Sequence, residues 1–237
     1  MTVNSPERPG LESDGNSGIC HSISEFQQAE FKTPAVGPIC NDTLKGAVVL
    51  SYLPRILTED EFALHIQPYK KYFLTPELKE EYEKKKIELT PFAKGAEAYV
   101  FTLPDINDKN VSLKDFKGKV VVLDMWAMWC GPCLKEKPYF QKIEEEYKNN
   151  KEIVFVSVST DGMGQKERWK DFVKRKGWHG IELISEYTES LMKYYKIEGI
   201  PRFMIFDKNG KIITVNAPRP SEAGFKLLIE QTLKTNS

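Results

Sequence analysis

The chain lacks a net charge, a long apolar run and the pattern of a leader sequence. Its 34 Lys and Arg residues balance 34 Asp and Glu residues, and no basic cluster disturbs that balance, which argues against general nucleic-acid binding. The sequence contains no run of about 18 apolar residues, so no membrane span is predicted. Residues 1–10 show neither the charged nor the apolar region of a signal peptide. We therefore expect either a cytoplasmic protein or a true start that lies upstream of residue 1.

The sequence is also poor in metal ligands. It has three His and four Cys residues, and its CxxC motif, Cys130 to Cys133, has no second CxxC or HxxxH pair to complete a zinc site. Covalent haem attachment requires CxxCH, but Leu134 follows Cys133. We expect no metal, and no cofactor other than a redox-active disulfide.

The CxxC motif lies where a predicted strand passes into a predicted helix. Residues 120–126 form an apolar, β-branched run that is typical of a strand buried on both faces. Residues 134–148 have helical periodicity, so Cys130 lies at a helix N-terminus, where free amides and the helix dipole favour a thiolate. Cys133 can close a disulfide with it across one turn. We interpret the pair as a dithiol/disulfide redox couple, with a purely structural disulfide as the alternative.

The N-terminal part carries no motif that predicts chemistry. Residues 1–40 are predicted to be largely disordered, because their first half is rich in Ser, Gly, Pro, Asn and Asp. Cys20 and Cys40 either bridge each other in an oxidising compartment or remain two unrelated thiols.

Residues 41–91 predict a small helical appendage. Thr58 and Glu61 match a capping box that opens a helix continuing to Tyr69. Thr75, followed by Pro76, predicts a second helix start.

Residues 92–237 alternate between strand and helix patterns. Strands are predicted at 98–103, from 111, and at 120–126, 153–158, 181–184, 203–207 and 211–215; helices are predicted at 134–148, 166–176, 188–195 and 221–234. This order predicts an α/β fold with a mixed central sheet flanked by helices.

Several motifs of this second part resemble the thioredoxin fold. Residues 124–133, DMWAMWCGPC, are similar to the thioredoxin active-site stretch, and residues 199–201, GIP, are similar to its cis-proline loop. The lead-in at 101–119 and the extra helix and strand at about 160–187 resemble the TlpA/ResA-like branch of thiol–disulfide oxidoreductases. The resemblance covers residues 92–237 and implies a thioredoxin fold with an insertion, acting as a protein-disulfide reductase.

The resemblance also implies roles for single residues. Cys130 is expected to be the more exposed, attacking thiolate, and Cys133 the less accessible, resolving thiol. Asp124 is expected to be the buried acid that moves protons to or from Cys133; a strand-end Asp bonded to nearby amides is the alternative. Glu136 stands where ResA-like proteins carry an active-site Glu, and it is equally a first-turn acid that complements the helix dipole.

A substrate-binding surface is implied around the motif. A cis Pro201 would place the backbone of Ile200 against the cysteines, where it would hold a peptide as an added strand. Trp129, beside Gly131 and Pro132, is expected to form a docking surface, whereas Trp126 is expected in the core.

Three residues depart from the pattern of the family or stand apart from it. Met128 lies beside the site where many relatives have a small or polar residue, and Arg202 adds a charge where Thr is common. Both departures leave the expected reaction unchanged, but the substrate is not identified. His179, in the insertion, is expected at the surface.

The Gly-Pro dipeptide between the cysteines resembles that of thioredoxin. Thioredoxin is a reducing couple with a reduction potential of about −270 mV, whereas oxidising couples lie at about −120 mV. We therefore predict a reductant of protein disulfides that an upstream dithiol donor reduces in turn. The family implies a periplasmic or otherwise extracytoplasmic location, with the cytoplasm as the alternative. Two other functions stay open: a peroxiredoxin-like thiol peroxidase, and a non-enzymatic binding or chaperone module with a vestigial redox site.

Overall fold

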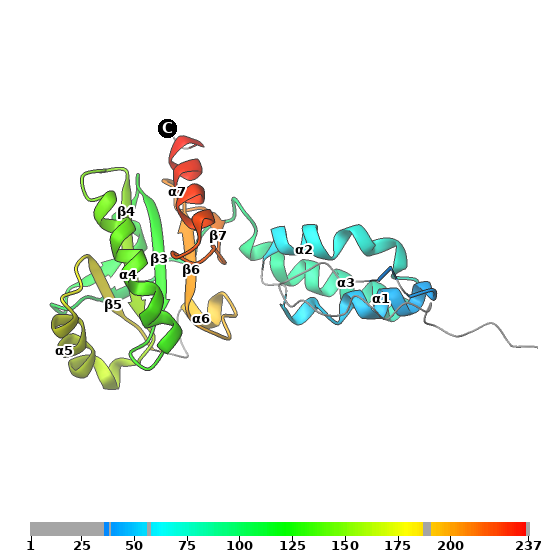
Figure 1. The fold of residues 1–237 in the computed structure, drawn as a ribbon, viewed down its shortest axis with the longest axis horizontal. Helices are drawn as coiled ribbons and strands as arrows, with labels where there is room; N and C mark the ends of the chain where they lie inside the picture. Colours follow the sequence, from blue (N-terminus) through cyan, green and yellow to red (C-terminus); the bar gives the residue numbers. More distant parts are fainter. Residues whose placement is uncertain (1–35, 38, 56–57, 187–190, 236–237) are drawn as a thin grey trace, which may run out of the picture.

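A computed structural model describes the protein over residues 36–37, 39–55, 58–186 and 191–235. Figure 1 shows two parts, a group of helices on one side and an α/β part on the other. Cys20 lies outside the described residues, as does nearly all of the segment 1–40. The Cys20–Cys40 bridge and the disorder of that segment therefore stay predictions.

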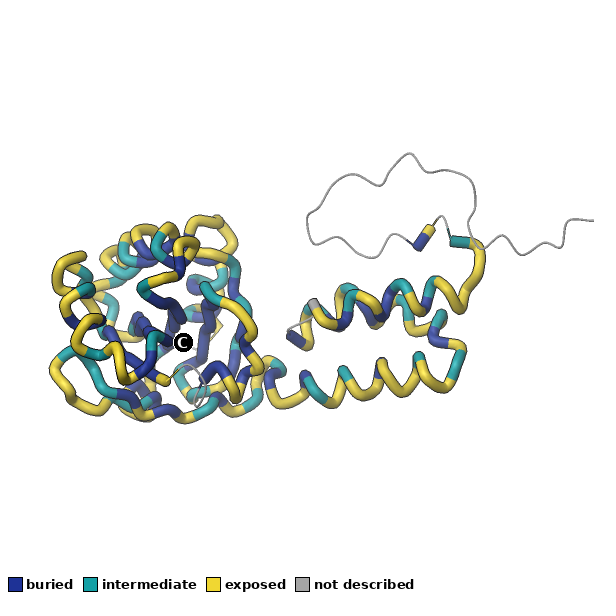
Figure 2. Tube along the Cα trace, turned by 90° about the horizontal axis from the view of Figure 1, so that it is seen from below, coloured by how far each residue is buried: buried dark blue, intermediate teal, exposed yellow. Residues whose placement is uncertain are grey.

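The helical part has a hydrophobic core of its own. It comprises α1 (Asp42–Leu50), α2 (Glu59–His65) and α3 (Pro76–Leu89), with the 3-10 turns η1 (Leu53–Arg55), η2 (Gln67–Tyr72) and η3 (Thr90–Phe92). Buried aromatic rings meet between the helices, with Phe62 and Phe73 each about 5 Å from Tyr82. In Figure 2 the buried residues of this part lie on the inner faces of the helices and the exposed residues lie outside.

The caps predicted for these helices are confirmed, but one helix is shorter than predicted. Thr58 and Glu61 form the capping box of α2, and the Thr75 side chain accepts the N–H of Leu78 at the start of α3. α2 ends at His65 rather than at Tyr69, because Pro68 has no N–H to donate to the helix. The chain continues there as η2.

A mixed sheet forms the centre of the α/β part, as predicted. Its strand order is β5-β4-β3-β6-β7, with bounds β3 Val120–Trp126, β4 Ile153–Ser159, β5 Ile181–Ile184, β6 Arg202–Phe206 and β7 Ile212–Thr214. β3, β4 and β5 are parallel, whereas β6 and β7 run antiparallel to their neighbours. β3 is buried along its whole length, so the strand that leads to the CxxC motif is the centre of the core.

The predicted strand at 98–103 is largely wrong. Only its last two residues pair, in β1 (Thr102–Pro104), which forms a separate two-stranded sheet with β2 (Asn110–Ser112). The residues before β1 are held by single contacts instead of a ladder: Ala98 N–H donates to the carbonyl of Gly210, and Tyr99 N–H donates to the Tyr195 hydroxyl. The apolar pattern of this segment reflects packing against the sheet rather than strand pairing.

Helices cover both faces of the sheet. α4 (Gly131–Glu146) and α7 (Ala223–Thr235) pack on one face, and α5 (Lys166–Lys176) packs beside them near β5. α6 (Leu191–Tyr194), η4 (Leu113–Phe116) and the β1–β2 hairpin cover the other face. The turn η5 (Met163–Gln165) leads into α5.

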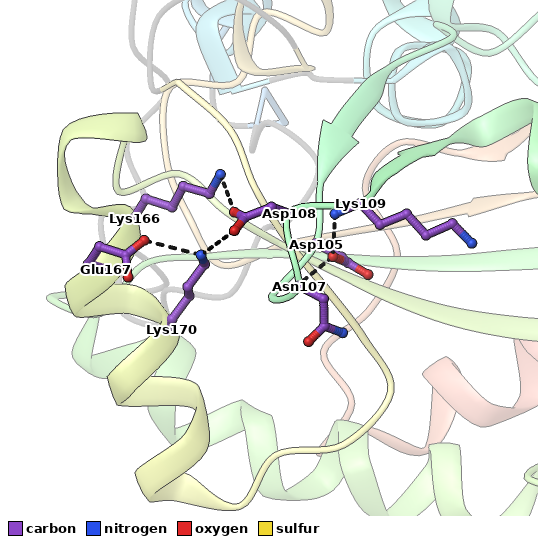
Figure 3. A network of polar contacts seen from close by, with 7 residues as sticks. All are labelled: Asp105, Asn107, Asp108, Lys109, Lys166, Glu167 and Lys170. Atoms are coloured by element: carbon purple, nitrogen blue, oxygen red, sulfur yellow. Dashed lines mark hydrogen bonds and ion pairs between the residues drawn. The ribbon is translucent and has the colours of Figure 1, made fainter.

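An ion-pair network holds α5 against the β1–β2 hairpin (Figure 3). Asp108, in the hairpin turn, binds Lys166 and Lys170, and Lys170 also binds Glu167 at 3.1 Å. These lysines lower the pKa of Asp108 to about 2. Asp105 shapes the same turn, because its carboxylate accepts the backbone N–H groups of two neighbouring residues.

Polar pairs among the described residues join the helical part to the α/β part. Asn216, which follows β7, donates to Glu61 of α2 at 2.8 Å. Lys196, which follows α6, lies 3.2 Å from Glu88 of α3. The first contact lies near the start of β6, the strand that follows Pro201.

Candidate active site

Cys130 and Cys133 form a disulfide at the start of α4. Their Cα atoms lie 5.2 Å apart. Cys130 is the N-cap of the helix, and its Sγ accepts the backbone N–H of Cys133 at 3.1 Å. Pro132 lies in the first turn, where a missing N–H costs nothing. This geometry matches the strand-to-helix junction that the sequence predicts, and a thiolate of Cys130 would lie at the positive end of the helix dipole.

The two cysteines are equally buried, which differs from the expectation that Cys130 is the more exposed. Each is 3% exposed. The loop before β6 lies over Cys130: the Ile200–Pro201 peptide bond is cis, as predicted, and the Ile200 carbonyl oxygen lies 3.8 Å from Cys130 Sγ. The backbone of Ile200 therefore stands against the motif.

The two tryptophans of the motif lie where they were expected. Trp126 is 1% exposed and packs in the core, whereas Trp129 is 66% exposed. An open pocket of about 290 Å³ adjoins Trp129 and is lined by Met128, Trp129, Asp161, Gln165 and Arg168. Asp161 fixes this loop, because its carboxylate accepts the N–H of Met128 at 2.9 Å. The surface beside Cys130 thus combines an apolar ring with one acidic and one basic side chain.

A buried charged cluster lies under α4. Asp124 of β3 is 3% exposed, and its Oδ2 lies 3.3 Å from Nζ of Lys137. The Lys137 ammonium also donates to Ser157 Oγ at 2.5 Å and lies 2.8 Å from Oε1 of Glu182. Asp124 thus binds side chains, not the nearby amides that the alternative interpretation required.

The charges of this cluster depend on one another. Burial raises the pKa of Asp124 and that of Glu182 above their usual values. Burial alone would lower the pKa of Lys137, but the attraction of Glu182 and Asp124 outweighs it, so that pKa is raised. Lys137 therefore remains a cation inside the protein.

Lys137 and Glu182 were not predicted as site residues, although the sequence carries a signal for each. Lys137 stands four residues after Cys133 and three before Phe140, on the buried face of α4. Glu182 interrupts an apolar strand pattern, the same anomaly that singles out Asp124.

Glu136 contacts the start of the last helix. Its carboxylate accepts the Ser221 backbone N–H and the Ser221 hydroxyl, each at 3.0 Å. These contacts hold the segment before α7 against α4. The active-site role that the resemblance implies for Glu136 stays a prediction.

Arg202 is buried instead of adding a charge to the docking loop. Its Nη1 donates to Asn216 Oδ1 at 2.6 Å, and Asn216 in turn donates to Glu61. The residue after the cis-proline is therefore linked to α2. His179 lies at the surface, as expected.

Neither a metal cluster nor a membrane-spanning helix is found in the part of the chain that the structure describes. No three His, Cys, Asp or Glu side chains gather there in a group that could hold a metal ion. None of the described helices is both long and apolar enough to cross a membrane.

Comparison with protein families finds a matching model. The Redoxin family model matches residues 93–226, which covers the sheet, the CxxC motif and the cis-proline loop.

Curated relatives carry the name thiol-disulfide oxidoreductase ResA. The protein of that name from Bacillus thuringiensis subsp. konkukian is 35% identical over 119 residues, which cover 50% of this chain and 66% of the relative. The one from Bacillus subtilis is 31% identical over 124 residues, covering 52% and 66%. The match thus spans about two thirds of the length of these relatives.

Solved structures with the same fold include proteins of bacterial redox families. A protein from Bacteroides vulgatus assigned as a thiol-disulfide oxidoreductase is 34% identical with a TM-score of 0.56, covering 60% of this chain and 99% of its own. A thiol:disulfide interchange protein from Bacteroides sp. is 29% identical with a TM-score of 0.51, covering 62% and 92%. The thioredoxin fold is therefore shown for the C-terminal part of the chain.

Proposed function

Because the chain belongs to the Redoxin family, we propose that it is a thiol–disulfide oxidoreductase that reduces disulfides in other proteins. One observation carries the proposal. The Cys130–Cys133 disulfide caps α4, with the Ile200 carbonyl oxygen 3.8 Å from Cys130 Sγ. This arrangement presents a reactive sulfur beside a backbone that can pair with an incoming peptide.

The first step is the attack of Cys130 on a substrate disulfide. The helix N-terminus favours the Cys130 thiolate, which bonds to one substrate sulfur while the other leaves as a thiolate. The product is a mixed disulfide between Cys130 and the substrate. The Ile200 backbone at Pro201, with Gly131, Pro132 and Trp129, holds the substrate during this step.

The second step is the attack of Cys133 on the sulfur of Cys130. The Cys133 thiol loses its proton, its sulfur forms the Cys130–Cys133 bond, and the second substrate sulfur leaves as a thiolate. Asp124 takes this proton, because Cys133 is buried and water is scarce around it. Two electrons have then passed from the protein to the substrate, and an upstream dithiol returns them.

The direction and the location are further parts of the proposal. Gly131 and Pro132 match the dipeptide of a reducing couple, which supports a reductant. The resemblance to the TlpA/ResA-like branch supports an extracytoplasmic site of action, where disulfide-containing substrates occur. A disulfide-containing protein and a dithiol donor are the expected partners.

The test is a reductase assay with matched cysteine variants. Wild-type protein should speed the reduction of a disulfide-containing protein by dithiothreitol, and Cys130→Ser should abolish that effect. Cys133→Ser should instead accumulate a covalent mixed disulfide, visible as a mass increase equal to the substrate. Full activity of Cys130→Ser would overturn the proposal. Faster turnover of hydrogen peroxide than of protein disulfides would favour a thiol peroxidase instead.

A further inference from the structure

The strand register aligns three polar side chains beneath α4. Asp124 of β3 pairs with Ser157 of β4, and Ser157 pairs with Glu182 of β5. Paired residues of adjacent strands point to the same face of a sheet. The three side chains therefore form one row across the sheet, on the face that α4 covers with Lys137.

Lys137 joins the two acids of this row. Its Nζ lies 3.3 Å from Asp124 Oδ2 and 2.8 Å from Glu182 Oε1. The Trp126 and Trp178 rings lie over the same ammonium, with centroids 5.4 and 4.9 Å away. Lys137 and both acids are at least nine-tenths buried, so the three charges lie together in a region that excludes water.

We propose that Asp124, Lys137 and Glu182 act as one buried site that holds a single exchangeable proton and exchanges it with the sulfur of Cys133. This inference rests on the proposed function, in which Cys133 must gain and lose a proton inside the protein. Asp124 alone would be the proton carrier in the simpler scheme. The new element is Glu182, which shares the proton through Lys137.

In the oxidised protein the count of charges favours one bound proton. With both acids ionised, two carboxylates face one ammonium, and the site carries a net charge of −1. A buried net charge is costly, whereas one proton makes the site neutral. The raised pKa values of Asp124 and Glu182, which burial causes, agree with this count. Glu182 Oε2 is buried, and the nearby Trp126 side chain favours the ionised form of this carboxylate, but burial outweighs that effect.

A site in this state can work as an acid and as a base at the same pH. In the oxidised protein the site holds the proton on one of its carboxyl groups, while Lys137 stays an ammonium. When the disulfide is reduced, the leaving Cys133 thiolate takes that proton, and Lys137 is left between two carboxylates. When Cys133 attacks Cys130, the S–H proton returns to one of these carboxylates and the sulfur forms the new S–S bond. Lys137 lies one helical turn after Cys133, and both side chains are on the buried side of α4.

Two further acids of α4 face the site and must be separated from it. Glu136 acts on Asp124 through its charge but is bonded to Ser221. Glu144, two turns after Lys137, is half-buried, and burial raises its pKa to about 7. Its titration near neutral pH would overlap that of the shared proton unless the measurement is made above this range.

The first experiment counts protonated carboxyl groups by infrared spectroscopy of the oxidised protein. At about pH 9 a group with a pKa of about 7 is ionised, and the wild type should still show the carbonyl stretch of one protonated carboxyl group. Glu182→Gln and Asp124→Asn should each remove that signal completely, because either leaves one carboxylate paired with one ammonium. Lys137→Met should keep it or double it. Glu144→Gln is the matched control and should leave it unchanged.

The outcomes decide the proposal even where a variant fails to fold. No carboxyl signal in the wild type at about pH 9 would overturn it without any variant. A wild-type signal that survives Glu182→Gln would overturn the sharing by Glu182. Because the oxidised protein is measured without substrate, a positive result stands even if the protein reduces no protein disulfide.

The second experiment tests the transfer to Cys133. Reduced protein is mixed with a chromogenic aromatic disulfide, whose first thiolate reports the attack of Cys130 and whose second reports the attack of Cys133. Glu182→Gln should slow the second phase by at least about tenfold, as expected for a lost proton carrier, and change its pH profile. The first phase should stay within about twofold. An unchanged second phase would show that the site holds a proton but does not pass it on, and would overturn that part.

Discussion

Glu136 accepts two hydrogen bonds from Ser221, one from its backbone N–H and one from its hydroxyl, and each has a length of 3.0 Å. The pair joins the first turns of α4 to the segment before α7, across 85 residues of sequence. A residue that the family resemblance places in the active site is thus, in this chain, bonded to the entry of the last helix.

Removal of either partner should lower the stability of the fold. Ser221→Ala loses one hydrogen bond and should lower the free energy of unfolding by about 1 kcal/mol. Glu136→Ala also leaves the Ser221 N–H without a partner and should cost about 1–3 kcal/mol. Urea denaturation measures both. A slower Cys133 step in Glu136→Gln, with Ser221→Ala unaffected, would show instead that Glu136 takes part in proton transfer.

The link from α2 to β6 should depend on Asn216. Asn216→Ala removes the acceptor of the buried Arg202 guanidinium and the donor to Glu61, and should cost about 1–3 kcal/mol. Amide hydrogen exchange should also rise in α2. Lys196→Ala is the control, because it breaks only the exposed ion pair with Glu88 and should cost less than about 1 kcal/mol. Equal exchange in both variants would contradict the link.

The contact between α5 and the β1–β2 hairpin should weaken in acid. The pKa of Asp108 is lowered to about 2 in the folded protein, from an unfolded value of about 3.9. A depressed pKa means that its stabilising contribution is present above the unfolded value and is lost as the pH falls through the folded one. Unfolding measured between about pH 5 and 2 should show this loss in the wild type.

Asp108→Asn removes the charge of this carboxylate and keeps the backbone conformation of the turn. Asp108 has a positive φ of 65°, which Asn tolerates well, so the turn should be kept while both ion pairs are lost. The variant should lose less stability than the wild type over the same acid range. Glu145→Gln, which removes an exposed carboxylate paired with Lys148, should behave like the wild type. An identical acid dependence in Asp108→Asn and wild type would refute this account.

Trp129 should matter for protein substrates more than for small ones. It is 66% exposed beside Cys130 and lines the adjoining pocket. Trp129→Ala should raise the KM for a protein disulfide by about tenfold and leave the rate with a small aromatic disulfide nearly unchanged. Tyr139→Ala, which removes an exposed aromatic ring of α4, is the matched control. Equal effects on both substrates would argue against a docking role.

Local patterns in the sequence predicted much of the α/β part. α5 was predicted over about residues 166–176, which are its observed bounds. Gly177 ends the helix in the left-handed conformation. β5 was likewise predicted over Ile181–Ile184. Both elements are set by periodicity and by residues at their own ends.

The parts that were missed depend on contacts between distant segments. The site around Asp124 needs Lys137 and Glu182, and no local pattern pairs them. Arg202 reads as a surface charge in sequence, but Asn216 accepts its hydrogen bond inside the protein. The equal burial of the two cysteines arises from the Ile200–Pro201 loop, 70 residues after Cys130. The sequence shows which residues carry charge, but it does not show which of these residues are in contact in the folded protein.

The reduction potential of the Cys130–Cys133 pair tests the central claim most directly. Purified protein is equilibrated in dithiothreitol redox buffers, and Trp fluorescence follows the change, since Trp126 packs in the same cluster as both cysteines. We predict a value well below about −200 mV, toward the −270 mV of thioredoxin, as a reductant of protein disulfides requires. A value near about −120 mV would contradict the account, because the protein would then introduce disulfides instead of reducing them.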